Sequence, residues 1–358
     1  MKKVLRKIHL WLSLPFGILI AIICFTGALL IIEKDIYRPL AYKEMLKVTP
    51  IDAPLPLDIL LPKVLENAPK DAEISGVTIY SNPESSYIVD IAKPHRSTFY
   101  VDQYSGEVLG QYERPTFFKS ASLLHRHLLD SSKDAVIGKN IVGITLIVFL
   151  VLLLTGIWLW WPVGKQQWRN KCRIHTRQGQ YRLWYDMHTI VAVYAVVVLL
   201  GCLLTGLIWT YPSVRSATYK LLNASRNETS EPHAKLQSIG SDFALWDRVF
   251  KEIPTQPYVS VTIRHNRATA LLKRNANNRA TDDYIFDAQN GTILKKISYS
   301  EKPKAEKVQG WISTLHRGTW GGWFSRILTF VAVLIGASLP VTGYYLWLKR
   351  LQKKRGSR

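Results

Sequence analysis

The sequence predicts an α-helical membrane protein with four transmembrane helices in two duplicated halves and two small α+β domains outside the bilayer. Three observations predict this class: four long apolar segments, three short basic segments, and a series of motifs that occurs twice in the same order. A net charge of +21 suits a nucleic-acid-binding protein, but such proteins rarely contain long apolar segments. A disordered chain would not contain 12 Trp, 17 Tyr and 11 Phe, and three Cys exclude a disulfide-stapled secreted scaffold.

Four apolar segments contain no Lys, Arg, Asp or Glu: Ile8–Ile32, Asn140–Trp161, Thr189–Tyr211 and Ile327–Leu348. About 20 consecutive apolar residues cross a bilayer as a helix, so each segment is long enough. A buried core helix is the alternative for any one of them, but four of this length argue against it. The first segment exceeds the apolar part of a signal peptide, about 7–15 residues, and no A-x-A site follows it.

Basic residues predict the orientation of these segments. Sixteen Lys and Arg, and no Asp or Glu, lie in residues 1–7, 165–182 and 349–358. Short basic segments remain in the cytoplasm, so we expect both termini and the middle loop inside. The chain is predicted to begin with a cytoplasmic N-terminus (1–7), a span (8–32), an outer domain (33–139) and a second span (140–161). A cytoplasmic loop (162–188), a third span (189–211), a second outer domain (212–326), a fourth span (327–348) and a cytoplasmic tail (349–358) follow.

Several motifs recur at similar offsets, which indicates an internal duplication. His9 lies 17 residues before Thr26, and His188 lies 17 residues before Thr205. Outside these spans the recurring sequences are Val77-Thr78-Ile79 with Val261-Thr262-Ile263, and Leu124-His125-Arg126 with Leu315-His316-Arg317. Each half therefore consists of a span, an outer domain, a histidine-bearing segment and a second span.

The two outer segments have the pattern of α+β domains. Alternating residues predict strands, Ser-Gly and Asn-Gly predict hairpin turns, and a helical pattern precedes each set. The segments concerned are strands Tyr87–Ile91 and Thr98–Val101, turns Ser105-Gly106 and Asn290-Gly291, and helices Pro56–Ala68 and Ser241–Ile253. Neither domain contains G-x-S-x-G, H-E-x-x-H, a Gly-rich phosphate loop or paired Cys, so nothing indicates a hydrolase.

The nine histidines fall into two groups. Four lie in polar loops, where we expect exposed surface residues: His95, His175, His233 and His265. The other five lie at the predicted membrane boundaries, on the cytoplasmic side for His9 and His188 and on the outer side for His125, His127 and His316. A single polar residue at the end of a span can simply lie in the headgroup layer.

Duplication gives these boundary histidines a further meaning. An approximate twofold axis normal to the membrane would relate the two halves. It would place His9 and His188 at the same depth in the membrane, and likewise His125 and His316. Two neutral imidazoles that face each other suit a six-coordinate haem iron, whereas structural zinc takes four protein ligands. No C-x-x-C-H occurs, so the predicted haems are b-type. His127 remains the rival outer ligand, although its repeat partner is Gly318.

A Thr-Gly pair occurs once in every span: Thr26-Gly27, Thr155-Gly156, Thr205-Gly206 and Thr342-Gly343. Glycine lets a helix or a flat ring approach the backbone closely, so we expect both helix packing and haem contact there. The predicted orientation places Gly27 and Gly206 with the outer histidines, and Gly156 and Gly343 with the inner ones.

The distance from His125 to the next span predicts a break in the chain. His125 lies 30 residues before Thr155, or about 45 Å along one helix, which exceeds a bilayer core of about 30 Å. We therefore expect a break near Asp130–Lys139, a short surface helix over Leu123–Leu129, and its repeat partner at Trp311–His316. Aromatic residues near the span ends, Trp209 among them, fit interfacial belts.

The motifs resemble those of the PepSY-associated transmembrane family. In the first half the matching segments are His9 to Gly27, Val101–Val108, Leu124–Leu128 and Thr155–Pro162. In the second half they are Asp186–Gly206, Phe286–Ile293, Leu315–Arg317 and Thr342–Trp347. The resemblance covers nearly the whole chain. His127 is an addition to the family's L-H-R-x-L pattern.

The resemblance implies iron-regulated proteins of the bacterial inner membrane, some of which are di-haem ferric-siderophore reductases. It implies PepSY-like periplasmic domains, two b haems held by His9, His188, His125 and His316, and electron transfer to a periplasmic ferric chelate. No flavin or nicotinamide fingerprint occurs, so a flavoprotein or a quinol would be the donor. Arg96, Arg126 and Arg317 could attract an anionic chelate or could be solvated surface charges. A PepSY regulator or assembly factor and an iron or siderophore transporter are the alternatives.

Overall fold

The computed structural model describes residues 1–93, 97–162, 164–224, 242–254 and 256–355, and the chain divides into two compact units. The first unit is helical and consists of Met1–Glu33, Pro115–Leu222 and Ile312–Arg358. The second contains the β-sheet and consists of Lys34–Arg114 and Asn223–Trp311.

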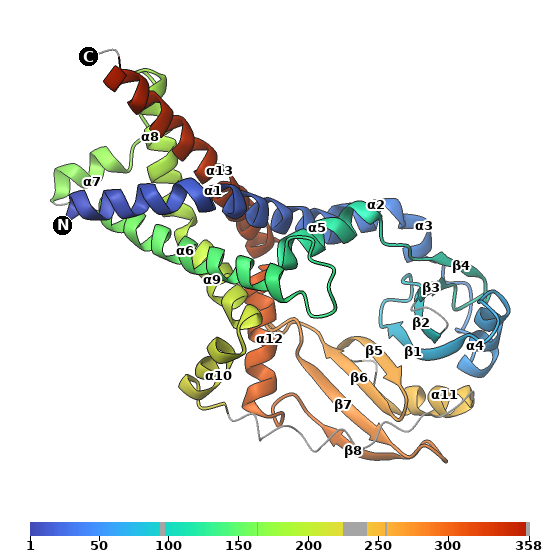
Figure 1. The fold of residues 1–358 in the computed structure, drawn as a ribbon. Coiled ribbons are helices and arrows are strands. Elements are labelled where there is room, and N and C mark those ends of the chain that lie inside the picture. Colours follow the sequence, from blue (N-terminus) through green and yellow to red (C-terminus); the bar gives the residue numbers. More distant parts are fainter. Residues whose placement is uncertain (94–96, 163, 225–241, 255, 356–358) are drawn as a thin grey trace. The chain divides into compact units, whose positions relative to one another are not determined.

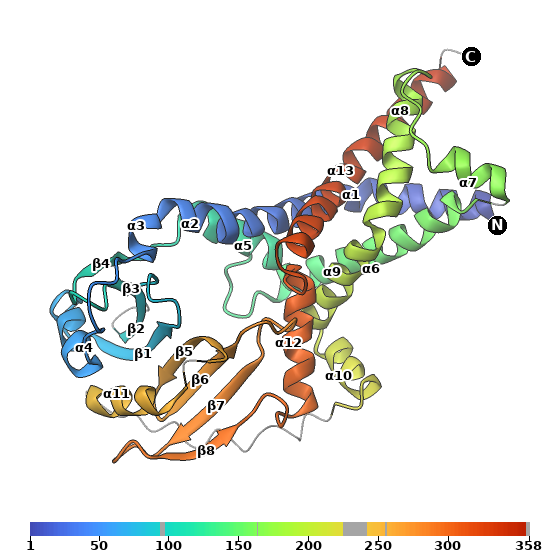
Figure 2. The ribbon, with the colours of Figure 1, turned by 180° about the vertical axis from the view of Figure 1, so that it is seen from behind.

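The first unit contains the four long helices that the apolar segments predict. Its elements are α1 (Lys2–Ile32), α5 (Thr116–His127), α6 (Val136–Trp160), α7 (Lys165–Lys171), α8 (Gln180–Asp186), η2 (Met187–Val191), α9 (Ala192–Thr210), α10 (Pro212–Leu221), the end of α12 (Lys304–Arg317) and α13 (Gly322–Arg355). Continuous helices long and apolar enough to cross a membrane cover Lys2–Ala41, Val136–Trp160, Gln180–Thr210 and Gly322–Lys353. The prediction of four candidate membrane helices is confirmed, and three of them extend well beyond the predicted segments because the helix continues into flanking polar residues (Figure 2).

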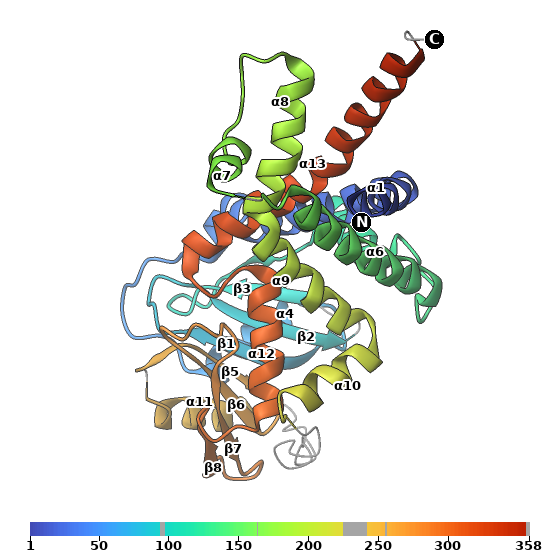
Figure 3. The ribbon, with the colours of Figure 1, turned by 90° about the vertical axis from the view of Figure 1, so that its left-hand side faces the viewer.

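The four long helices pack in a ring, in which α1 and α9 each contact both α6 and α13 (Figure 3). Inside the ring, apolar side chains such as Ile20, Phe149 and Leu199 form a buried cluster. The outward surface is also apolar, since residues such as Val197 are largely exposed. Apolar residues on both the inside and the outside are typical of helices surrounded by lipid.

The predicted break between α5 and α6 is confirmed. Helix α5 ends at His127, Leu128 and Leu129 adopt positive φ angles of 48° and 66°, and α6 begins at Val136. Helix α5 contacts both α1 and α6, so it folds back against the bundle. Helix α12, which carries His316, likewise ends at Arg317, and Gly318 with a φ of 66° separates it from α13.

The second unit is built on one antiparallel sheet of eight strands in the order β4-β3-β2-β1-β5-β6-β7-β8. The strands are β1 (Glu73–Tyr80), β2 (Tyr87–Lys93), β3 (Ser97–Val101), β4 (Val108–Gln111), β5 (Tyr258–Arg264), β6 (Arg267–Leu272), β7 (Thr281–Phe286) and β8 (Ile293–Ile297). The helical elements of this unit are η1 (Glu33–Tyr37), α2 (Arg38–Ala41), α3 (Lys43–Leu46), α4 (Leu57–Glu66), α11 (Phe243–Glu252) and the start of α12.

The two outer segments therefore form one sheet and one compact unit, where the sequence led us to expect two small domains. Strand β1 pairs with β5 so that Thr78 lies opposite Thr262, with their hydroxyl oxygens 2.9 Å apart. A four-stranded sheet on its own would leave β1 or β5 as an edge with unpaired N–H and C=O groups. Pairing the two edges satisfies these groups.

Helices α4 and α11 lie beside one another and cover one face of the sheet (Figure 1). The core between the helices and the sheet takes Leu60 and Leu61 from α4, Val249 from α11, and alternate residues of the strands such as Val89 and Ile263. The two predicted hairpin turns are present, and Gly106 and Gly291 adopt φ angles of 78° and 77° there.

We predict that Leu60→Ala weakens this unit and that Ile59→Ala on the same helix does not. Leu60 is fully buried and Ile59 is 48% exposed. Truncating a buried leucine costs about 2–5 kcal/mol, whereas surface substitutions change stability by about 0.5 kcal/mol or less. Hydrogen exchange of the β1 and β5 amides, measured on the full chain, should rise in the first variant alone. Equal exchange in both variants would contradict this packing.

Candidate functional site

Two histidines of the long helices each contact a Thr-Gly pair on a neighbouring helix. His9 on α1 lies with its Nδ1 atom 3.0 Å from the Thr155 hydroxyl of α6. His188 in η2 lies with its Nδ1 atom 2.8 Å from the Thr342 hydroxyl of α13. These two histidines, which the sequence analysis pairs as repeat equivalents, therefore make the same contact.

The two histidines of the short helices make this contact as well. His125 on α5 lies with its Nδ1 atom 3.3 Å from the Thr26 hydroxyl and 2.8 Å from the Ile23 carbonyl, both on α1. His316 on α12 lies with its Nδ1 atom 2.9 Å from the Thr205 hydroxyl and 3.0 Å from the Cys202 carbonyl, both on α9. The carbonyls of Leu152 and Leu339 take the corresponding places near His9 and His188.

These contacts fix the tautomer of the imidazoles. Each Thr hydroxyl donates its single hydrogen to a carbonyl of its own helix, at 2.8 Å for Thr155 to Val151 and 2.6 Å for Thr205 to Gly201. Toward the imidazole, the hydroxyl oxygen can then act only as a hydrogen-bond acceptor. The backbone carbonyl oxygens near Nδ1 are also acceptors only. The imidazole nitrogen Nδ1 must therefore carry the hydrogen. In a neutral imidazole this leaves the Nε2 lone pair free to bind a metal.

The glycine after each threonine lies beside the imidazole, and of the four it is Gly27 where a Cβ atom would crowd the ring. A Cβ atom would lie 3.1 Å from His125 Cε1 at Gly27, and at Gly156, Gly206 and Gly343 it would lie 3.5, 3.7 and 3.5 Å from the Cε1 atoms of His9, His316 and His188. By contrast, no side chain or neighbouring backbone lies within 4 Å of the Cβ position at Gly201. The Thr-Gly pair thus provides a hydrogen-bond acceptor and a bare backbone surface for one imidazole.

The His125 and His316 rings lie next to each other in an edge-on contact, with their centroids 6.2 Å apart and their planes at 61°. A metal ion midway between the centroids would lie about 3.1 Å from each, and about 2 Å from an Nε2 atom that pointed at it, which is the length of a metal–imidazole bond. The pair therefore has the separation that two imidazoles adopt when they bind opposite sides of one metal ion.

His9 and His188 line a common cavity of about 310 Å³ within the helical unit. Gly156 and Gly343 line the same cavity, together with apolar side chains such as Phe149 and Leu152. The arrangement fits a flat, mostly apolar group that is bound by one imidazole on each side.

His125 and His316 lie outside the membrane-spanning helices and are held neutral. Burial lowers the pKa of His316 to about 3, and the nearby His125 adds to the shift. Burial also lowers the pKa of His125, although the hydrogen bond to the Ile23 carbonyl opposes this. Neutral imidazole is the form that binds a metal, so the pair is available as ligands at physiological pH.

The rival ligand His127 occupies a different environment. It is the last residue of α5, and its buried Nδ1 atom has no hydrogen-bond partner among the described residues. Its carbonyl oxygen lies against Gly138 of α6, where a Cβ would be only 1.8 Å away. Among the described residues, the Thr-Gly contacts are made by His9, His125, His188 and His316, and none involves His127.

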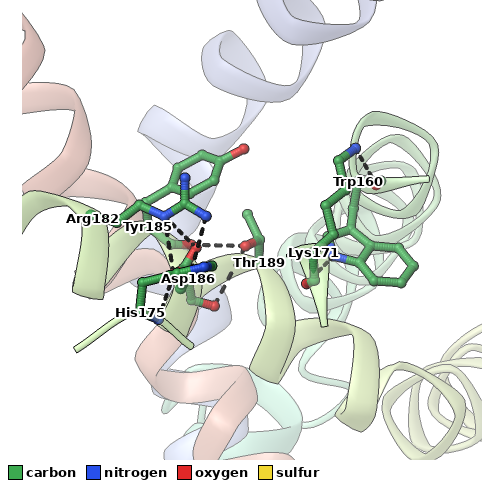
Figure 4. A network of polar contacts seen from close by, with 7 residues as sticks. All are labelled: Trp160, Lys171, His175, Arg182, Tyr185, Asp186 and Thr189. Atoms are coloured by element: carbon green, nitrogen blue, oxygen red, sulfur yellow. Dashed lines mark hydrogen bonds and ion pairs between the residues drawn. The ribbon is translucent and has the colours of Figure 1, made fainter. Parts of the chain in front are cut away.

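The expectation that His175 is an exposed loop residue is wrong. Its side chain is 23% exposed, and its Nδ1 atom lies 2.9 Å from the Asp186 carboxylate (Figure 4). Arg182 also binds Asp186, at 3.0 Å, and Asp186 itself is buried. This network ties the loop before α8 to the residue two positions before His188. His265 lies in the turn between β5 and β6, while His95, His233 and Arg96 lie outside the described residues.

One contact of this site carries no sequence signal that we could have used. Trp209 packs against His316, with ring centroids 4.6 Å apart. Its position near the end of a span suggested an interfacial aromatic belt, because several tryptophans share that position. Its place three residues after Gly206 becomes meaningful only when the imidazole is seen to lie on that glycine.

The α5–α6 turn should be sensitive to Gly138→Ala. The added Cβ would lie 1.8 Å from the His127 carbonyl oxygen and 2.7 Å from Asp130 Cβ, so the turn must open. Overpacking of this kind costs about 1–3 kcal/mol. We expect a lower melting temperature of the purified full chain, while Gly201→Ala should melt like the parent protein. A Gly138→Ala protein with an unchanged melting temperature would contradict the close approach.

Comparison with known protein families agrees with this architecture. The profile of the PepSY-associated TM region matches residues 6–350, which cover nearly the whole chain. No curated protein matches the sequence significantly. Because the match includes all four long helices and all four histidine contacts, the chain belongs to the family defined by the PepSY-associated TM region.

Proposed function

We propose that this protein is a di-haem b oxidoreductase of the bacterial inner membrane, which transfers electrons from a donor on the cytoplasmic side to a ferric siderophore or similar chelate in the periplasm. The observation that carries this proposal is the set of four imidazoles that share one tautomer and form two pairs. His9 and His188 would hold one haem, and His125 and His316 would hold the other.

The residues of each pair have distinct tasks. Each imidazole offers its Nε2 lone pair, and the threonine fixes the orientation and basicity of the ring, as hydrogen bonds to a ligand histidine generally do. The glycine leaves bare backbone beside the imidazole, most tightly at Gly27. When bound, the two haems would supply one-electron redox chemistry at two depths.

The separation of the two pairs supports transfer across the bilayer. Helix α1 contributes His9 to one pair and Gly27 to the other, and these residues are 18 positions apart, or about 27 Å along the helix. A bilayer core is about 30 Å thick, so the pairs would lie near its two faces. The basic segments at residues 1–7, 165–182 and 349–358 favour the His9/His188 end as the cytoplasmic one.

Reduction of a ferric chelate fits an outward electron path. One electron converts Fe(III) to Fe(II), which hard oxygen ligands hold less tightly. A flavoprotein or a quinol would be oxidised in return at the other end. A transporter is less well supported, because the four predicted apolar segments contain no charged residue that would mark an ion path.

A visible spectrum of the purified protein tests the proposal directly. We expect b-type Soret and α bands in the reduced-minus-oxidised spectrum and two haems per chain by the pyridine haemochrome assay. Replacing His9 or His188 by Ala should remove one haem, and replacing His125 or His316 should remove the other. His127→Ala is the matched control and should retain both, because His127 makes no Thr-Gly contact among the described residues.

A folded protein without haem would refute the redox function and favour a membrane-anchored regulator. Loss of one haem from His127→Ala, with both haems retained in His125→Ala, would instead exchange the two ligand assignments and leave the function intact.

The threonines allow a finer prediction. Thr155→Val should weaken haem binding at the His9/His188 pair about 10- to 100-fold, the usual effect of losing a hydrogen bond to a metal ligand. Thr145→Val is the control on the same helix, since buried Thr145 donates to the Ile141 carbonyl and contacts no histidine among the described residues. Haem transfer to an excess of apomyoglobin measures the difference. Equal transfer from both variants would show that the Thr155 contact does not support the ligand.

A further inference from the structure

Two arginines line the cavity that His9 and His188 share. Arg6 comes from α1 and Arg350 from α13, and they are the charged residues among those that line this cavity of about 310 Å³. Its interior wall is mostly apolar, with Ile20 and Phe149 among its residues. An apolar cavity that ends at two cations suits a ligand with an apolar body and anionic groups.

Each arginine lies on the same side of its helix as a residue of the site. Arg6 lies three residues before His9, which places both on one side of α1. Arg350 lies seven residues after Gly343, about two turns further along the same side of α13. Both arginines are exposed, whereas His9 and Gly343 are half-buried. The guanidinium groups therefore lie where the cavity opens.

We propose that Arg6 and Arg350 bind the two propionate carboxylates of the haem held by His9 and His188, an inference that rests on the proposed function. Haem carries both carboxylates on one edge of an apolar ring, which matches a cavity with both cations at its opening. Guanidinium binds carboxylate through paired hydrogen bonds, with a geometry that an ammonium group does not offer. Tyr181 and Tyr185 of α8 line the same cavity and add two hydroxyl groups.

Basic residues near a membrane face also occur simply because short basic segments stay in the cytoplasm. The chain contains matched residues that separate the two explanations. Lys7 and Lys349 are the immediate neighbours of Arg6 and Arg350, carry the same charge and are likewise exposed. Neither is among the residues that line the cavity. A topological role alone predicts equal effects for arginine and lysine variants.

The expected effect of the arginines on the midpoint potential of the haem has a definite sign. Positive charge beside a haem stabilises the reduced form, which carries one positive charge fewer, so removing an arginine should lower the midpoint potential. Arg6→Gln and Arg350→Gln should each shift the equilibrium of one haem at least threefold toward the ferric form, and the double variant should shift it further. Lys7→Gln and Lys349→Gln should leave both haems unchanged.

The experiment is a potentiometric titration of the purified full chain, followed by haem quantification. The same arginine substitutions made in His188→Ala, which should retain only the His125/His316 haem, should shift nothing. Arg6→Lys and Arg350→Lys test a charge without the paired hydrogen bonds. They should restore part of the midpoint potential that the glutamine variants lose, but they should release haem faster than the parent protein. If the double glutamine variant does not fold, the lysine variants provide the test in its place.

Three outcomes would overturn the inference. If all four glutamine variants titrate like the parent protein while two haems remain, the arginines do not bind the propionates and the proposed function stands. If the arginine variants change only the reduction rate by an added donor, with potentials and haem release unchanged, the arginines serve an anionic donor instead. If the parent protein contains no haem, the proposed function itself fails.

Discussion

The hydrogen bond from a histidine Nδ1 to a threonine hydroxyl is the interaction on which the helical unit depends. The threonine gives its hydrogen to its own helix and keeps only acceptor capacity for the imidazole. An imidazole N–H buried without a partner costs about 1–3 kcal/mol. Four such bonds therefore favour specific neighbours: α1 with α6, η2 with α13, α5 with α1, and α12 with α9. All four pairings involve a helix of the ring, and two of them, α1 with α6 and η2 with α13, join ring neighbours because η2 continues into α9, so ring order and histidine placement support each other.

The same constraint explains why α5 and α12 are short. His125 must reach Thr26 on α1, which runs before it in the chain, and a helix continuous with α6 would carry it away from that contact. The left-handed conformations of Leu128 and Leu129 allow α5 to fold back. At the other break Gly318 adopts the left-handed conformation, where glycine is the favoured residue. Two different local solutions thus give the same placement of a histidine.

Sequence reasoning located the long helices, the break after α5 and strands β2 and β3, because these features depend on hydrophobic pattern, length and turn residues close in the chain. It could also sort the glycines with their histidines, since orientation follows from basic residues and both motifs repeat. The β1–β5 pair was beyond its reach, because nothing local to Val77 or Val261 states which edge the strand will meet. Asp186 and His175 were missed for a related reason. An ion pair in a basic loop becomes visible only when the loop folds back on α8. Which groups occupy the histidine pairs is a question of chemistry that neither spacing nor packing answers alone.

The near-identity of the four Thr-Gly contacts bears on the direction of electron transfer in the proposed function. Under the proposed function, the two haems would be bound through the same histidine atom, the same kind of acceptor and the same kind of glycine surface, so these contacts alone would not make their affinities for electrons differ. A difference would come from the other side chains around each pair, because the predicted repeat relates the two histidines within a pair and does not relate one pair to the other. Around His9 and His188 these include Arg6 and Arg350, which line the cavity. At the other end Trp209 packs on His316, and the equivalent position after Gly27 is Leu30. The Thr-Gly contacts hold the four imidazoles alike, so under the proposed function the side chains that differ between the surroundings of the two pairs would set which haem accepts electrons more readily.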